Sequence, residues 1–192
     1  MRIGAACKFA LALVGSLWAV WFLGLLLPLN LQNWGIWPRH LRGVVGVPIA
    51  PFLHKDAGHL AANSGPLLVL ATLGLAAAPR ATAKALAVIV FAGGGMVWLL
   101  GDPLALLGAS GPVAVHIGAS GVVFGLAGFL TLFGALRRDW RTLAASLVTL
   151  LLYASMLAGL FYAPAGTSLS SHIFGFGAGL WAAWLFRNDA RA

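Results

Sequence analysis

Residues 118–136 read GASGVVFGLAGFLTLFGAL, a run of apolar and small residues without one charged side chain. A helix needs about 20 such residues to cross the hydrocarbon core of a bilayer, so this run predicts a membrane span that starts near Ser120. Similar runs recur along the chain, at about 9–29, 59–78, 84–101, 119–136, 142–162 and 172–186. Because the chain is 61% hydrophobic and 8% charged, we expect one all-α polytopic membrane domain over residues 1–192 and no soluble domain.

Basic residues are divided unevenly between the two sides of such a six-helix bundle. If the N-terminus lies in the cytoplasm, the inner segments hold most of them, namely Arg2, Lys8, Arg80, Lys84, Arg137, Arg138, Arg141, Arg187 and Arg191. The outer segments hold only Arg39, Arg42 and Lys55. Cytoplasmic loops carry an excess of Lys and Arg, so we expect both termini in the cytoplasm and a multi-pass chain in the inner (cytoplasmic) membrane. The net charge of +8 then reflects topology and does not indicate nucleic-acid binding.

The longest connection, residues 30–58, is expected to be a non-helical outer loop. It carries Trp34 and Trp37 among Asn, Pro and Gly residues. Indole rings favour the headgroup level of a bilayer, so this outer loop is predicted to lie in or against the membrane interface.

Polar residues gather at the first turns of three predicted spans. The second, fourth and sixth spans all run from outside to inside, so their first residues share one depth near the outer face. His59 and Asn63 open the second span, Ser120 opens the fourth and His172 opens the sixth. Ionisable side chains within spans are costly and are functional candidates by default.

Ser120 and His172 form a candidate nucleophile and general base. A serine hydroxyl is a weak nucleophile until a neighbouring base takes its proton, and His172 enters its span at the same depth. No Asp or Glu lies within a span, which favours a Ser-His dyad over a triad, with the imidazole packed against Phe124. Two alternatives stay open, because Ser120 could simply cap its helix and His172 could be a buried histidine that bonds a carbonyl.

The oxyanion of a tetrahedral intermediate needs hydrogen-bond donors placed where its charge develops. His59 and Asn63 lie four residues apart and therefore share a helix face. Together with the backbone N–H groups of Gly118 and Ala119, they are the predicted stabilising donors. The alternative is a polar pair that only joins the second span to the fourth.

Small residues line one face of each of two predicted spans. Gly121, Gly125 and Gly128 share a face of the fourth span, and Gly175 and Gly179 share a face of the sixth. Small residues at such spacing let helix backbones approach closely. This pattern predicts a packing seam between the two spans that carry Ser120 and His172.

Three other features compete for these roles. The tetrapeptide Gly108–Gly111 repeats the GASG sequence, but Pro112 follows it and no membrane-length helix can begin there. His116 is a second candidate base, although it precedes the helix and is expected to point into the outer loop. His54 and His59 could suggest a metal, but no acidic partner or second ligand pair accompanies them, so no metal is expected.

These motifs resemble the rhomboid family of intramembrane proteases. The resemblance rests on PFLHKDAGHLAAN at 51–63, GASGVVF at 118–124 and SHIFG at 171–175. It implies a bacterial six-helix bundle with Ser120 as nucleophile, His172 as general base, and His59 and Asn63 stabilising the oxyanion. It also implies transmembrane protein substrates cut near the outer face and no cofactor. One departure is that the outer loop reads Val44-Val45-Gly46 where many relatives carry a Trp-Arg pair.

Alternatives from other classes are a small transporter and a rhomboid-like protein that binds membrane clients without cutting them. A transporter predicts polar residues throughout the membrane depth, whereas here they gather at the outer ends. A client-binding relative usually lacks the nucleophile or the base, and both residue types are present here. A specialised protease that processes C-terminal membrane anchors is a third possibility, on which the sequence does not decide.

Overall fold

The computed structural model describes the chain except residues 1, 28–29, 102–114, 162–166 and 190–192. The described part is helical. Its α-helices are α1 (Ile3–Leu26), α2 (Leu41–Ile49), α3 (Ala57–Ala77), α4 (Pro79–Val88), α5 (Gly94–Leu100), α7 (Ser120–Arg137), α8 (Trp140–Tyr153) and α9 (Leu169–Phe186). The π-helical turn η3 (Ile89–Gly93) joins α4 to α5, and 3-10 turns form η1 (Leu31–Trp34), η2 (Ala50–Phe52) and η4 (Ser155–Leu160).

Five described helices are long and apolar enough to cross a membrane. They are α1, α3, the continuous helix Pro79–Leu100, α7 and α9. The predicted span 142–162 corresponds to α8, which is shorter at 14 residues and is followed by η4. The protein is therefore a multi-pass helical membrane protein, and the count of six spans stays a prediction.

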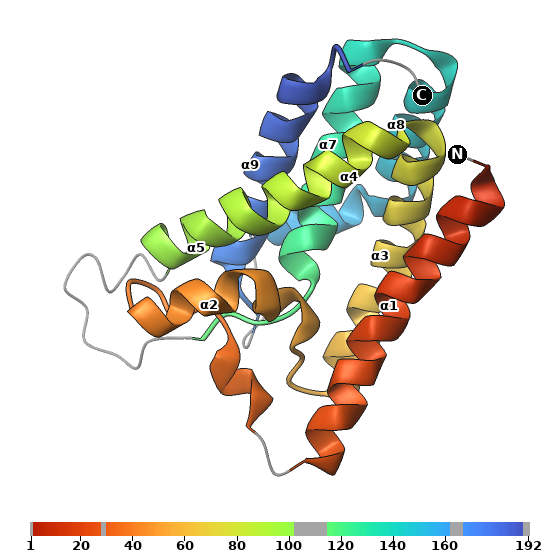
Figure 1. Ribbon diagram of the computed structural model, residues 1–192. Coiled ribbons are helices and arrows are strands. Elements are labelled where there is room, and N and C mark those ends of the chain that lie inside the picture. The colour runs from red at the N-terminus through yellow and green to blue at the C-terminus, as the bar shows by residue number, and fades with distance from the viewer. Residues whose placement is uncertain (1, 28–29, 102–114, 162–166, 190–192) are drawn as a thin grey trace.

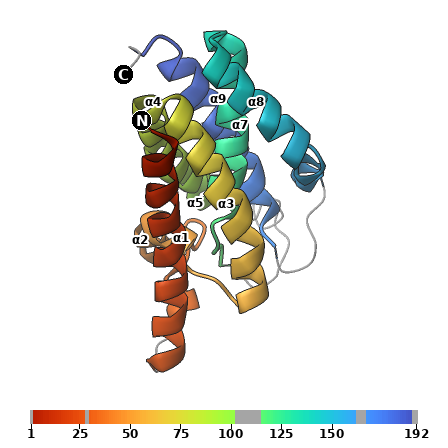
Figure 2. The same ribbon diagram turned by 90° about the vertical axis from the view of Figure 1, so that its right-hand side faces the viewer.

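The helix α7 lies at the centre of the bundle, between α3, α8 and α9 (Figures 1 and 2). Most of its residues are buried, and large side chains such as Phe129 and Phe133 have almost no exposed surface. Both α3 and α9 run in the same direction as α7, so the first turns of these three helices lie toward one end of the bundle. We call this end, which carries Asn63, Ser120 and His172, the polar end.

The predicted glycine seam between the spans of Ser120 and His172 is confirmed. A side chain at Gly175 would run into the backbone carbonyl of Gly121, and one at Gly179 would run into that of Gly125. A Cβ atom at Gly128 would lie 2.7 Å from the Phe176 carbonyl oxygen. The backbones of α7 and α9 therefore touch where any larger residue would force them apart.

The expectation that residues 30–58 are non-helical is wrong. This segment contains η1, the nine-residue helix α2 and η2, and α2 packs beside α5 (Figure 1). Gly43 packs against the Trp37 backbone and Gly46 against the Gly35 backbone so closely that a Cβ atom would collide. Glycine lowers helix propensity, so the residues that allow this tight packing also hid the helix in the sequence.

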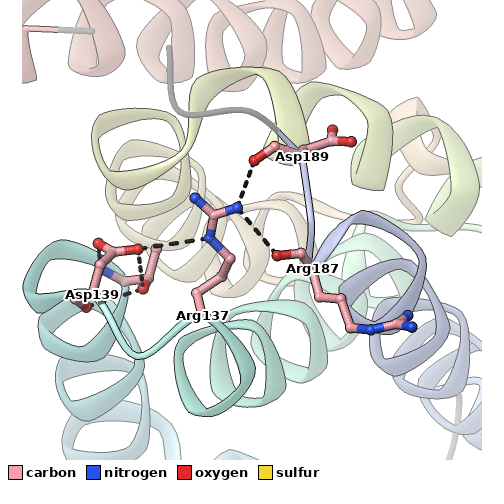
Figure 3. Close-up of polar contacts among 5 residues, drawn as sticks. Arg137, Asp139, Arg187 and Asp189 are labelled. Atoms are coloured by element: carbon pink, nitrogen blue, oxygen red, sulfur yellow. Dashed lines mark hydrogen bonds and ion pairs between the residues drawn. The ribbon is translucent and has the colours of Figure 1, made fainter.

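The opposite end of the bundle is held by an arginine. Arg137, at the end of α7, donates hydrogen bonds to the backbone carbonyls of Arg187 and Asp189 beyond α9 (Figure 3). Its Nε lies 3.8 Å from Asp139 Oδ2, and Asp139 caps α8 through the Thr142 N–H. We call this end, which carries Arg137, Asp139, Arg187 and Asp189, the arginine end.

Candidate active site

Ser120 is the first residue of α7 and does not cap the helix. Ala119 occupies the N-cap position, and no side chain caps this end. The alternative that Ser120 serves as a plain N-cap is therefore wrong. The Ser120 side chain is partly exposed, and its Oγ makes no hydrogen bond with any described residue.

The start of α7 leaves backbone donors open. The first N–H groups of a helix have no acceptor within it, and those of Ser120, Gly121 and Val122 make no hydrogen bond within the described part of the chain. The first bond of the turn runs from the Val123 N–H to the Ala119 carbonyl, at 3.0 Å. Three open donors and the positive end of the helix dipole thus lie at the start of α7, the turn that Ser120 opens.

His172 is buried in the first turn of α9 and is held on two sides. Its ring stacks on Phe124, with centroids 4.1 Å apart and planes inclined by 16°. Its Nδ1 lies 3.1 Å from the Gly159 carbonyl oxygen in η4. A carbonyl only accepts, so Nδ1 carries the proton and Nε2 is the ring nitrogen with a free lone pair. A base needs this tautomer, although the carbonyl contact itself would also suit a purely structural histidine.

Neighbouring residues bring Ser120 and His172 to the same place. Phe124, which stacks on His172, lies one helical turn after Ser120. A Cβ atom at Gly121, the residue after Ser120, would lie 3.2 Å from the Ser171 carbonyl oxygen. No hydrogen bond joins Ser120 Oγ to His172 among the described residues. Catalytic hydrogen bonds are often long or misaligned before substrate binds, so this geometry is compatible with a dyad.

His59 and Asn63 lie beside the loop that precedes Ser120. A Cβ atom at Gly118 would lie 2.7 Å from His59 Cε1 and 3.8 Å from Asn63 Nδ2. Gly118 also has φ of +108°, a conformation that side chains disfavour. Asn63 is buried and donates from Nδ2 to the His59 carbonyl at 3.0 Å, and its second amide hydrogen remains available.

The backbone N–H groups of Gly118 and Ala119 are occupied. The Gly118 N–H donates to the Ala50 carbonyl at 2.9 Å, and the Ala119 N–H donates to His54 Nε2 at 3.3 Å. The sequence pattern located this loop but could not indicate which way its amides point. Ser120 and Gly121 are better placed to supply backbone donors.

His54 is a site residue whose role the sequence did not indicate. It is buried, and its ring meets that of His59 edge-on at 5.1 Å. Burial, with a smaller contribution from His59, lowers the pKa of His54 from 6.5 to about 4. The ring is thus neutral at neutral pH, and its Nε2 can accept from the loop. In the sequence, the first histidine of the PFLHKDAGH stretch suggests only a metal ligand.

The sequence suggested that the His116 side chain points into the outer loop, and this expectation is wrong. His116 is buried with 6% of its surface exposed, and its Nδ1 lies 2.6 Å from Ser168 Oγ at the start of α9. Its backbone pairs in both directions with Ile36. The loop before α7 is therefore fixed against residues 30–56, which we call the outer segment after their expected position. Gly108–Gly111 lies outside the described residues.

The remaining polar groups do not assemble a metal centre. Within the described ranges, no three His, Cys, Asp or Glu side chains are grouped so that they could hold an ion. A cavity of about 40 Å³ borders Gly118, Gly121 and Ser171, which is room for roughly one water molecule.

The apolar bundle, with a serine and a histidine at the starts of two tightly packed helices, defines a polytopic membrane protein with a polar site at one end. Residues 41–189 match the Rhomboid domain. The chain therefore belongs to the rhomboid family, whose members are generally intramembrane serine proteases, and the resemblance inferred from the sequence is confirmed.

The chain is also similar to mycobacterial proteins of uncharacterised function. It is 38% identical over 160 residues to Uncharacterized protein Rv1337 of Mycobacterium tuberculosis (strain ATCC 25618 / H37Rv), covering 82% of this chain and 65% of that protein. It is 33% identical over 166 residues to Uncharacterized protein ML1171 of Mycobacterium leprae (strain TN), covering 84% of this chain and 64% of that protein. The chain thus spans slightly less than two thirds of these relatives.

Proposed function

We propose that the protein is an intramembrane serine endopeptidase that cleaves transmembrane segments of other membrane proteins through a Ser120–His172 dyad. The observation that carries this proposal is the fixed orientation of His172. Its Nδ1 bonds the Gly159 carbonyl, its ring stacks on Phe124, which lies one turn after Ser120 in α7, and its Nε2 is left to act as base.

The reaction follows from the roles of these groups. His172 Nε2 takes the proton from Ser120 Oγ as the oxygen attacks the scissile carbonyl, and the charge moves onto the carbonyl oxygen. The N–H groups of Ser120 and Gly121, with the side chains of His59 and Asn63, stabilise this oxyanion. His172 then gives the proton to the leaving amine as the peptide bond breaks. Water hydrolyses the acyl-enzyme by the same steps in reverse order.

Placement in the membrane is part of the proposal. We place the polar end just under the outer face of the cytoplasmic membrane, because Arg137, Arg138, Arg141 and Arg187 all lie toward the arginine end, where an excess of basic residues marks the cytoplasm. The 14 residues of α8 rise about 21 Å, and the six residues of η4 add about 12 Å. Laid along one axis, the two would span about 33 Å, enough for the hydrocarbon thickness of about 30 Å, which supports a sixth crossing.

Such a site would give the reaction water within reach of lipid-embedded substrates. The bilayer core excludes water, but a polar end near the surface does not. A substrate helix must still unwind locally, because its intact backbone hydrogen bonds hide the scissile carbonyl. Substrates with helix-weakening residues near the outer face are therefore the expected class.

The test is labelling of purified protein by a serine-directed fluorophosphonate, together with cleavage of a reporter transmembrane segment in liposomes. We expect wild type to label and cleave, and Ser120→Ala to do neither. Ser16→Ala is the matched control, because Ser16 is a span serine in α1 that bonds only the Leu13 carbonyl, and it should behave as wild type. Labelling or cleavage by Ser120→Ala would overturn the assignment, and a folded but inert wild type would favour a client-binding protein.

A further inference from the structure

A second histidine and a second serine precede the two dyad residues, each by four positions. His116 precedes Ser120 by four residues, and Ser168 precedes His172 by four. The two are in contact, with His116 Nδ1 2.6 Å from Ser168 Oγ. The segments that lead into α7 and α9 are therefore joined by a hydrogen bond just before each delivers its reacting residue.

Ser168 links His116 to the first turn of α9, which carries His172. Ser168 is the N-cap of α9, and its Oγ accepts from the Ser171 N–H at 3.1 Å. The two hydroxyls lie 2.8 Å apart, and the Ser171 carbonyl lies against Gly121. If Ser168 donates to His116 Nδ1, the Ser171 hydroxyl can donate to Ser168 Oγ. If His116 donates, Ser168 donates to Ser171 Oγ instead, so the His116–Ser168 bond can form with either ring nitrogen protonated.

His116 is itself held from the other side. Its backbone exchanges two hydrogen bonds with Ile36, each of 3.0 Å. The imidazole therefore extends from a backbone that is fixed against the outer segment, and its buried ring has little freedom to follow a displaced Ser168.

We propose that the His116–Ser168 hydrogen bond positions His172 relative to Ser120, so that both are positioning residues and neither is a catalytic one. The inference rests on the proposed protease function. No direct bond holds Ser120 Oγ to His172 among the described residues, so their separation depends on how α7 and α9 are joined. A displacement of about 1 Å in an active site can reduce turnover about 100-fold.

The experiment compares kcat and KM for reporter cleavage in His116→Leu, Ser168→Ala and the double variant. We expect each single variant to lower kcat about 10- to 100-fold and to change KM less than about twofold. The kcat of the double variant should be no lower than that of the less active single variant, because both changes break the same hydrogen bond. His116→Asn, which places an amide near the position of Nδ1, and Ser168→Thr should each recover most of the loss.

Ser146→Ala is the matched control, because Ser146 is a buried serine whose hydroxyl bonds the Thr131 carbonyl between α8 and α7, away from the dyad. It should keep wild-type kcat. Wild-type kcat in both single variants, or multiplicative losses in the double variant, would overturn the inference. If His116→Leu fails to fold, Ser168→Ala and the two conservative variants decide. An inert wild type would instead refute the protease proposal, and the two failures are therefore distinguishable.

Discussion

The two ends of the α7–α9 pair are finished in opposite ways. At the arginine end, the carbonyls beyond α9 accept hydrogen bonds from Arg137, and Asp139 links that arginine to the cap of α8. At the polar end, α7 begins without a side-chain cap, and its first N–H groups have no partner among the described residues. The helix α7 is thus tied by hydrogen bonds at its last turn and left open at its first, whereas α9 begins with the Ser168 side-chain cap.

This difference indicates that one end of the bundle contributes mainly to stability and the other mainly to the reaction. Unpaired backbone groups at a helix end cost free energy unless something satisfies them. The arginine end satisfies its carbonyls within the protein, whereas the polar end retains donors that a reacting carbonyl oxygen could use. We therefore expect changes at the polar end to act on turnover and changes at the arginine end to act on stability.

The sharpest contrast is expected for His172→Ala. Loss of the proposed base should lower kcat by roughly 10⁴-fold or more, with the thermal midpoint in detergent little changed. Reporter cleavage and circular dichroism during heating measure the two effects. His40→Ala, which removes an exposed histidine of the outer segment, is the control and should retain activity. A His172→Ala variant with near-normal turnover would break the comparison.

A smaller loss of turnover is expected for Asn63→Ala. Removing one oxyanion donor costs about 100- to 1,000-fold in kcat, and KM should change much less, because the charge that Asn63 stabilises exists only in the transition state. Steady-state kinetics on the reporter separate the two constants. A rise in KM with kcat intact would place Asn63 in substrate binding instead.

A substitution at the arginine end should lower stability and leave turnover nearly unchanged. Arg137→Ala leaves the carbonyls of Arg187 and Asp189 without their side-chain donor and Asp139 without its nearby cation, and we expect a loss of about 1–3 kcal/mol in stability. Mild chemical unfolding in detergent measures it, with kcat at permissive temperature within about threefold of wild type. Arg137→Lys should recover only part of the loss, because an ammonium group cannot reproduce the planar fork. A 100-fold fall in kcat would show that the two ends are coupled.

The smallest effect concerns Asp139. Burial opposes its ionisation, but hydrogen bonds from Thr142 and the nearby Arg137 guanidinium outweigh burial and lower the pKa of Asp139. A lowered folded-state pKa gives stability that is present above the ordinary value of 3.8 and is lost as the pH falls through the folded-state value. Asp139→Ala should thus cost about 1 kcal/mol at neutral pH. The difference in unfolding free energy between Asp139→Ala and wild type, measured by chemical unfolding, should become smaller in acid. A difference that does not change with pH would exclude the ionised carboxylate as its cause.

The elements that the sequence predicted best are those with a strong local pattern. The apolar runs located five long helices, and the glycine spacing located the seam between α7 and α9. The apolar run predicts that α9 begins near 172, whereas the helix begins at Leu169. Ser168 before an apolar run is an N-cap signal for that earlier start. The burial of His116 and the carbonyl of Gly159 beside His172 had no such signal, because both depend on contacts between distant segments.

The π-helical turn Ile89–Gly93 has a consequence for the outer segment. An extra residue in one turn rotates everything after it by about 100° relative to a regular helix. With this rotation, Gly93 faces α9 and Gly94 faces Val47 of α2, while Trp98 Nε1 reaches the His40 carbonyl and the Gly101 carbonyl reaches Arg39. Deleting a single residue from this turn would preserve the hydropathy of the span and yet swing Trp98 and Gly101 away from their partners. Hydropathy alone would therefore not reveal that the length of this one turn sets the contacts of α5 with Arg39, His40 and Val47.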